Sequence, residues 1–246
     1  IEKPFSYIVP YYRFPATTVV YDKEGNRVRK ILEVPLTEDL PKGFMAVRKG
    51  MRNLSWRDDK PATLVFAKAL DGGDPEKEAE YRDEVFLWKA PFEDEPESLM
   101  KTVNRFSGIM WGDNKLAAAT DYWWNTRNTK IYLFNPSDPS EEPKIIFDRN
   151  YQDRYNDPGR PVSRKNQYGR QVLDIDGSYL YLMGDGYSDE GIRPFVDKYN
   201  YKTGETERLW RADGESTLER LFFALDMKKG KVLSRIESSN TYPNYY

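Results

Sequence analysis

The chain has 246 residues, in which 38 Lys and Arg nearly balance 40 Asp and Glu, and it contains no His and no Cys. Because both are missing, the chain alone cannot assemble a Ser-His-Asp or Cys-His catalytic device or an ordinary zinc or copper site, whereas carboxylate sites for calcium or magnesium stay open. The net charge of −2 excludes a broad electrostatic attraction to nucleic acid or to acidic membranes.

Hydropathy and aromatic content together indicate a folded chain rich in short strands. The mean hydropathy is −0.82, yet 15% of the residues are aromatic, whereas disordered chains are poor in aromatics. No apolar run approaches the roughly 20 residues of a membrane-spanning helix. The chain opens at Ile1 without a signal sequence, so we expect that a signal peptide was removed or that the segment comes from inside a longer protein.

The first predicted strands form an incomplete sheet. Aromatic and β-branched residues favour strands over Phe5–Arg13, Ala16–Tyr21 and Arg27–Val34. No further apolar run precedes them that would supply an inner strand. We therefore expect the chain to begin inside a repeating unit rather than at its start.

Turns built on aspartate then recur along the chain. They contain Asp58, Asp113, Asp176 and Asp226, at intervals of 55, 63 and 50 residues. Each turn precedes an apolar, β-rich run, and three of them also follow one, as expected for hairpins. The following runs are 62–67, 116–124, 179–183 and 232–236, and the preceding ones are 106–111, 172–175 and 221–225.

Two more strands complete each repeat. In chain order they are predicted over 84–89 and 98–103, over 129–134 and 144–148, and over 195–200 and 206–210. Pro75–Tyr81 is the one segment where a helical turn or two is expected. Four strands in a repeat of about 40 to 50 residues are typical of a propeller blade.

The predicted fold class is therefore all-β, a fragment of a β-propeller with four-stranded antiparallel blades. Three full blades are expected over 44–104, 105–150 and 170–213, and two partial blades over 1–36 and 219–246. If the partial blades do not complete each other, the ring is open, and its unpaired edges invite self-association. The alternative is a long β-sandwich or two small β domains.

Strand alternation in a blade collects the longer connections on one face of the domain. Long loops in a compact domain are usually functional or disordered. The acidic loop Leu70–Asp83 does not match a calcium-binding loop, so we expect a solvated acidic turn. The other long connections are expected at Asn125–Thr129, Arg149–Arg170 and Gly184–Arg193.

These loops and the strand before one of them supply the candidate substrate-binding residues. An arginine fork suits a carboxylate, and adjacent tryptophans offer an aromatic platform. The alternatives are that the arginines pair with local carboxylates such as Asp153, Asp157 and Asp189, and that the tryptophans pack between blades. For Arg82, Asp83 and Arg105 we expect structural ion pairs. The candidates are Arg127, Arg154, Arg160, Arg193, Trp123 and Trp124.

Several motifs resemble the propeller of serine peptidases in the prolyl-oligopeptidase superfamily, and most closely its glutamyl-endopeptidase-like branch, whose bacterial members are often labelled dipeptidyl aminopeptidases. The resemblance covers nearly the whole chain. The similar stretches are 56–62, 71–74, 81–85, 105–109 with Trp111-Gly112, 123–127, and 235–238 through 242–246.

The resemblance implies a division of labour within a longer parent protein. The family's catalytic Ser, Asp and His sit in a C-terminal α/β-hydrolase domain, and no Gly-x-Ser-x-Gly elbow occurs here, so no catalytic residue is assigned. That domain is expected beyond residue 246. Glu141-Glu142 lies in a connection between outer strands and does not match the paired glutamates of dipeptidyl peptidases, which leaves the specificity open.

The expected function is thus a non-catalytic propeller portion that gates peptide access and packs on the hydrolase domain of the same parent. Peptide substrate is the expected ligand, with no metal, no cofactor, no nucleic acid and no membrane span. A periplasmic or secreted parent is expected, while a cytoplasmic one stays open. The alternative function is a free-standing scaffold or carbohydrate-binding propeller.

Overall fold

The computed structural model describes residues 1–214 and 216–246, and it divides into two compact units. Unit 1 comprises Ile1–Gly108 with Asp121–Trp124, and unit 2 comprises Ile109–Thr120 with Asn125–Tyr246. Over the described residues the regular structure is β-strand, apart from the short 3-10 helices η1 (Tyr11–Arg13) and η2 (Met227–Lys229). In the same residues, no helix has the length and apolar character needed to cross a bilayer.

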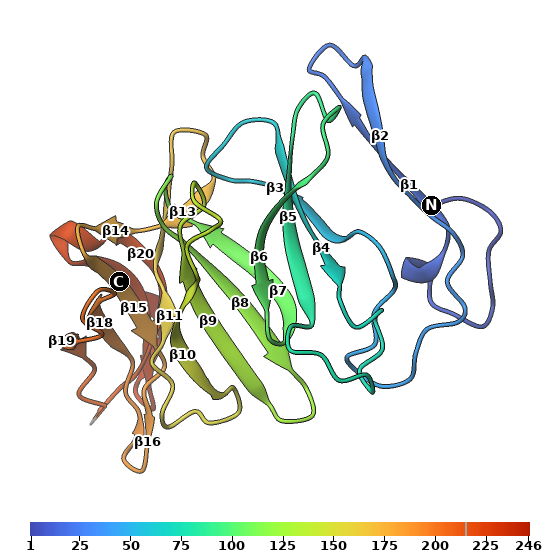
Figure 1. Cartoon of the computed structure of the whole chain (residues 1–246). Helices are drawn as coiled ribbons and strands as arrows, with labels where there is room; N and C mark the ends of the chain where they lie inside the picture. Colours follow the sequence, from blue (N-terminus) through green and yellow to red (C-terminus); the bar gives the residue numbers. More distant parts are fainter. Residues whose placement is uncertain (215) are drawn as a thin grey trace. The chain divides into compact units, whose positions relative to one another are not determined.

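Unit 1 contains two antiparallel sheets (Figure 1). The first pairs β1 (Ala16–Tyr21) with β2 (Arg27–Val34). The second is a meander in which sequential strands are neighbours, because each connection returns the chain alongside the strand it has just left. Its strands are β3 (Arg52–Trp56), β4 (Thr63–Ala69), β5 (Asp83–Lys89) and β6 (Glu97–Thr102).

The next sheet repeats this meander. The turn between its first two strands is closed by Asp113, whose Oδ1 accepts hydrogen bonds from the backbone N–H of Lys115 at 2.7 Å and of Leu116 at 3.0 Å. This is the aspartate turn expected from the sequence. The strands are β7 (Arg105–Trp111), β8 (Ala117–Trp123), β9 (Asn128–Phe134) and β10 (Lys144–Asn150), and they are neighbours in chain order.

The fourth sheet, in unit 2, has a divided inner strand. β11 (Arg160–Pro161) and β14 (Ile175–Asp176) both pair with β15, and a hairpin of β12 (Ser163–Lys165) and β13 (Gln171–Leu173) lies between them in sequence. The sheet therefore already begins at Arg160, before residue 170 where it was expected. The remaining strands are β15 (Tyr179–Gly184), β18 (Phe195–Asn200) and β19 (Thr206–Arg211), with the small hairpin β16 (Tyr187–Ser188) and β17 (Gly191–Ile192) between β15 and β18.

The last sheet has three strands: β20 (Leu218–Asp226), β21 (Lys231–Ser238) and β22 (Thr241–Tyr245), in that order. Asp226 caps η2 between β20 and β21, since its carboxylate accepts the backbone N–H of Lys229 at 3.2 Å, and Gly230 ends η2 in the left-handed conformation.

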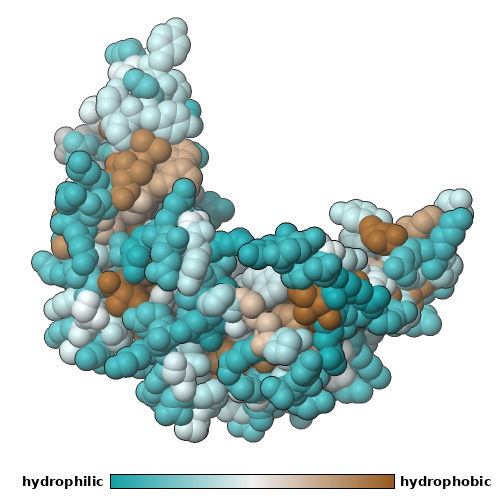
Figure 2. All heavy atoms as spheres, turned by 90° about the horizontal axis from the view of Figure 1, so that it is seen from above, coloured by the Kyte–Doolittle hydropathy of each residue, from teal (hydrophilic) through white to brown (hydrophobic). Residues whose placement is uncertain are grey.

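Apolar residues from alternate strand positions form the cores. In unit 2, one cluster contains Leu116, Leu133, Leu173 and Leu180. A second contains Val162, Tyr181, Met183, Val196 and Met227. Figure 2 shows that the surface in view is mostly hydrophilic, with hydrophobic residues in small separate patches, in accord with the low mean hydropathy.

The expected all-β class with four-stranded antiparallel blades is confirmed by these sheets. Two local expectations are wrong, and a third holds only in part. Phe5–Arg13 is not a strand, because Pro4, Pro10 and Pro15 remove backbone donors that a ladder needs. Pro75–Tyr81 forms turns rather than a helix. The loop Leu70–Asp83 is a solvated acidic turn only in part, because Glu76, Glu78 and Glu80 are exposed whereas Asp71 and Asp83 are buried.

Candidate functional site

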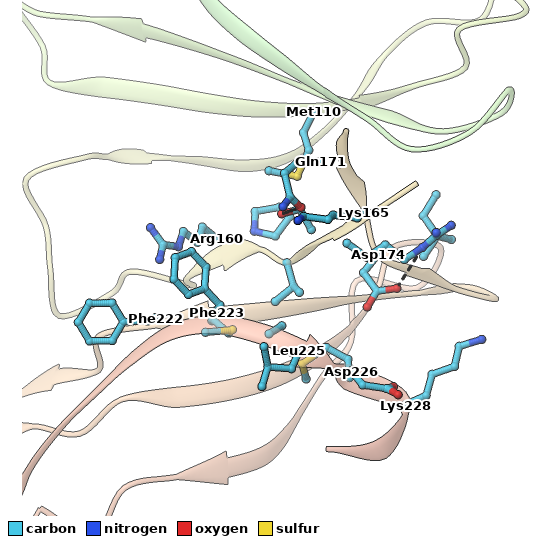
Figure 3. A pocket seen from close by; sticks show the side chains of 18 residues that line it. Met110, Arg160, Lys165, Gln171, Asp174, Phe222, Phe223, Leu225, Asp226 and Lys228 are labelled. Atoms are coloured by element: carbon cyan, nitrogen blue, oxygen red, sulfur yellow. Dashed lines mark hydrogen bonds and ion pairs between the residues drawn. The ribbon is translucent and has the colours of Figure 1, made fainter. Parts of the chain in front are cut away.

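Unit 2 contains a pocket of about 1090 Å³ at the inner strands of its sheets (Figure 3). One wall comes from β11 and the β12–β13 hairpin, and another from β20 and η2. Met110 of β7 closes it from a third side. The charged and amide side chains that line it are Arg160, Arg164, Lys165, Gln171, Asp174, Asp226 and Lys228.

Close backbone packing fixes Arg160 in this wall. Gly159 has φ +82°, and a Cβ placed there would lie 2.8 Å from the carbonyl carbon of Met183, so only glycine lets β11 approach β15. After β11, the backbone N–H of Val162 donates to the carbonyl of Tyr181 at 2.8 Å. Arg160 lines the pocket, and its guanidinium has no hydrogen bond or ion pair with any residue that the structure describes.

The β12–β13 hairpin presents polar side chains to the same space. Lys165 lies opposite Gln171 in the ladder, and Ser163 Oγ donates to Gln171 Oε1 at 3.1 Å. Arg164 reaches Asp174 at 3.6 Å, drawn as the dashed line in Figure 3. Lys165, like Arg160, has no ion-pair partner among residues 1–214 and 216–246.

The β20 wall is apolar and exposed. Register shifts between Leu221 and Phe223 and between Ala224 and Asp226 break the alternation of side chains along this strand. Phe223 and Leu225, two residues apart on the same face of this edge strand, are 63% and 65% exposed. The pocket thus combines an aromatic and aliphatic surface with polar groups from the facing wall.

Burial changes the acid–base behaviour of Asp174, which lines the pocket, and of Tyr181 in the neighbouring core cluster. Desolvation raises the pKa of Asp174, and the charges of Arg164 and Lys228 only partly offset it. Burial, together with a hydrogen bond to Asp176, raises the pKa of Tyr181 to about 12. Four cationic side chains line the pocket against two carboxylates, so its charge suits an anionic group on a partly apolar ligand.

Only Arg160 among the four predicted arginines lines this pocket. Arg127 lies in the β8–β9 turn with φ 57°, and its carbonyl accepts the backbone N–H of Tyr151 at 2.7 Å. Arg154 donates to the hydroxyl of Tyr187 at 3.1 Å and lies over that ring. Arg193 pairs with Glu190 at 3.1 Å.

These positions change two sequence-based interpretations of the arginines. Arg160 stands in a strand rather than in a long loop. The alternative of pairing with local carboxylates holds for Arg193, whose partner is Glu190. Of the carboxylates named for it, Asp153 caps its own turn at Tyr155 and Asn156, and Asp157 pairs with Arg149 at 2.9 Å.

The two tryptophans have different environments in unit 1. Trp123 is buried, with the guanidinium of Arg82 at 4.3 Å and that of Arg105 at 5.8 Å from its ring centroid. Trp124 is partly exposed and stacks on Phe44 with ring centroids 4.1 Å apart. Packing therefore accounts for Trp123, which has little exposed surface for a ligand.

A buried ion network in unit 1 surrounds Trp123. Arg105, only 2% exposed, donates to Asp71 at 2.7 Å and to Asp83 at 3.2 Å, and Arg52 also pairs with Asp83. Burial disfavours the charged form of Asp71, but hydrogen bonds from Arg105 and Arg82 outweigh it and lower its pKa. The expected structural ion pairs are thus confirmed.

Sequence reasoning missed most of the residues that line the pocket. Many of these residues lie on or next to the inner strands of the sheets. The sequence predicts two of these strands, at 172–175 and 221–225, and their position could have been used to select candidate residues. The lining residues not foreseen include Lys165, Gln171, Phe222, Phe223, Leu225 and Lys228.

No family model matches the chain, whereas two curated proteins match it over its whole length. A probable chloroplastic glutamyl endopeptidase of Arabidopsis thaliana is 37% identical over 261 residues, covering 100% of this chain and 27% of that protein. The corresponding protein of Oryza sativa subsp. japonica is 36% identical, covering 100% of this chain and 28% of that protein. The chain therefore spans little more than a quarter of these relatives.

Among solved structures, an oligogalacturonate lyase in complex with manganese aligns with a TM-score of 0.44 and 16% sequence identity, covering 91% of this chain and 50% of that one. The resemblance to the glutamyl-endopeptidase-like branch, stated above from sequence motifs, is confirmed by the similarity to the two curated relatives along the entire chain.

Proposed function

We propose that the chain is the propeller portion of a serine peptidase of the prolyl-oligopeptidase superfamily and that it is not catalytic by itself. The observation that carries the proposal is the 36–37% identity, over the whole chain, to proteins named as probable glutamyl endopeptidases. Because the chain spans only 27–28% of them, the parent has room for a separate hydrolase domain, which we place C-terminal to residue 246.

In this proposal the pocket of unit 2 contacts the peptide on its way to the catalytic domain. The pocket offers an apolar surface on β20 and, opposite it, the guanidinium of Arg160 without a partner among the described residues. A carboxylate of the peptide would receive two parallel charge-assisted hydrogen bonds from that guanidinium. Arg154 and Arg193 are held by Tyr187 and Glu190, so we assign them structural roles.

The face that carries the long connections is proposed to pack on the hydrolase domain and to limit access to it. The names of the two relatives place those proteins in chloroplasts. A periplasmic or secreted location of the parent remains a prediction that none of the comparisons supports.

An active-serine probe tests the division of labour directly. The full-length parent should be labelled stoichiometrically by a fluorophosphonate, and the isolated 246-residue chain should not, because it contains no His and no Gly-x-Ser-x-Gly elbow. Labelling of the isolated chain, or a parent that neither takes up the probe nor hydrolyses any peptide, would contradict the proposal.

A further inference from the structure

The β12–β13 hairpin leaves and re-enters the fourth sheet at one point. β11 before it pairs with β15 at Arg160↔Met183, and β14 after it pairs with β15 at Ile175↔Leu180. Between them, the backbone N–H of Asp174 donates to the carbonyl of Val162 at 3.0 Å. The hairpin is therefore an excursion from the inner edge, and the ladder on either side of it is intact.

The root of the hairpin is fixed by core packing. A ladder of three residue pairs is only marginally stable alone, so the hairpin needs such support. Val172 and Leu173 at its end are buried, and Leu173 belongs to the core cluster of Leu116, Leu133 and Leu180. The root of the hairpin is therefore anchored in the core of unit 2.

The far end is exposed, polar and well ordered by its own turn. The side-chain oxygen of Asn166 accepts the backbone N–H of Tyr168 at 2.9 Å and of Arg170 at 3.0 Å, and Gly169 takes φ +71°. Tyr168 and Arg170 project into solvent. Residues 163–171 include three cations and no carboxylate.

The hairpin also forms one side of the pocket. Ser163, Arg164, Lys165 and Gln171 form its wall, and β12 lies beside β20, which supplies the opposite side (Figure 3). A polypeptide that occupies the pocket has to fit between a wall anchored in the core and the aromatic surface of Phe222 and Phe223.

We propose that the β12–β13 hairpin is a size-selecting element that admits a single extended peptide and rejects wider, looped ones. This inference rests on the proposed function, since it assumes that substrate peptides pass the pocket. It goes further by assigning the selection to one inserted hairpin of this chain.

The test compares a linear peptide substrate with the same peptide closed into a loop by a disulfide, using the full-length parent. In one variant Arg164–Gln171 are replaced by two glycines, which keeps the buried root. We expect the ratio of kcat/KM for the looped peptide to that for the linear one to rise about tenfold, equivalent to about 1.4 kcal/mol. Removal of Asp138–Ser140 from the exposed β9–β10 connection is the matched control and should leave the ratio unchanged.

A second variant keeps the hairpin and enlarges it. Gln167→Cys places the only thiol of this chain at the exposed tip, where a bulky maleimide can be attached, and the unsubstituted parent treated with the same reagent is the control. The ratio of kcat/KM for the looped peptide to that for the linear one should then fall. If the shortened variant does not fold, this second variant tests the proposal in its place. Unchanged ratios would overturn the size selection and leave the proposed function intact, whereas a parent that hydrolyses neither peptide overturns both.

Discussion

At the scale of single residues, the two units use arginine in opposite ways. Arg105 in unit 1 is buried, and its guanidinium donates hydrogen bonds to Asp71, Asp83 and the carbonyl of Met45. Arg160 in unit 2 is exposed to the pocket and has no partner among the described residues. The first arrangement stabilises the fold, while the second leaves the donor fork available to a ligand.

Arg160→Ala in the full-length parent should reduce the preference for acidic over neutral peptides. Loss of a charge-assisted pair worth about 1.5 to 3 kcal/mol corresponds to roughly tenfold to a hundredfold in the ratio of kcat/KM values. Steady-state kinetics with Glu and Ala substrates measure this ratio. Arg154→Ala is the matched control, because Arg154 is engaged by Tyr187, and an equal loss in both variants would argue against a specific role for Arg160.

Asp71→Asn should destabilise the chain at neutral pH by about 3 to 5 kcal/mol, because it leaves Arg105 and Arg82 short of a buried counter-charge. The pKa of Asp71 is lowered in the folded state, so its contribution is complete above the unfolded value of about 3.9 and is lost as pH falls through the folded value.

Urea denaturation at a series of pH values measures this dependence. The difference in the free energy of unfolding between wild type and Asp71→Asn should be constant from neutral pH down to about pH 4 and should become smaller at lower pH. Lys89→Ala, which removes an exposed ion pair with Glu97, should cost at most about 1 kcal/mol. A difference that stays the same at low pH would show that the Asp71 charge is not its cause.

At the scale of elements, the divided inner edge of the fourth sheet depends on glycine. Gly159→Ala should destabilise unit 2, because the added methyl group clashes with the Met183 carbonyl. It should also reduce the preference for acidic over neutral peptides that we assign to the adjacent Arg160. Gly177→Ala is the control: it has a similar positive φ, but nothing lies within 4 Å of its Cβ, so it should cost only the backbone strain of about 1 to 2 kcal/mol. Equal losses in urea denaturation would contradict the role of close packing.

The elements that the sequence predicted well are hairpins with a specific turn chemistry. The turns at Asp113 and Asp226 are predictable from the residue type, because the aspartate side-chain oxygen accepts a backbone N–H of the turn. β11 was not predicted, because a strand of two residues shows no periodicity of apolar and polar side chains. β3 was not predicted either, because Arg52–Trp56 contains no continuous apolar run. The pocket was largely missed for the same reason, since it depends on which short strands share the inner edge.

At the scale of the whole molecule, free sheet edges and exposed apolar residues favour association of the isolated chain. Phe223 and Leu225 on β20 are the main exposed apolar groups of the pocket wall. We expect light scattering to show dimers or larger species whose proportion rises with concentration. Phe223→Ser should reduce them, and a strict monomer at high concentration would contradict this expectation.

The closed root of the β12–β13 hairpin also makes this position modular. Since the chain returns to Asp174 directly beside Val162, a segment of different length or sequence can be exchanged there without disturbing the pairing of β15. Related chains are then free to vary in this insertion while the surrounding ladder stays the same. The same position offers protein engineers an entry point for grafting a foreign recognition loop onto the rim of the pocket.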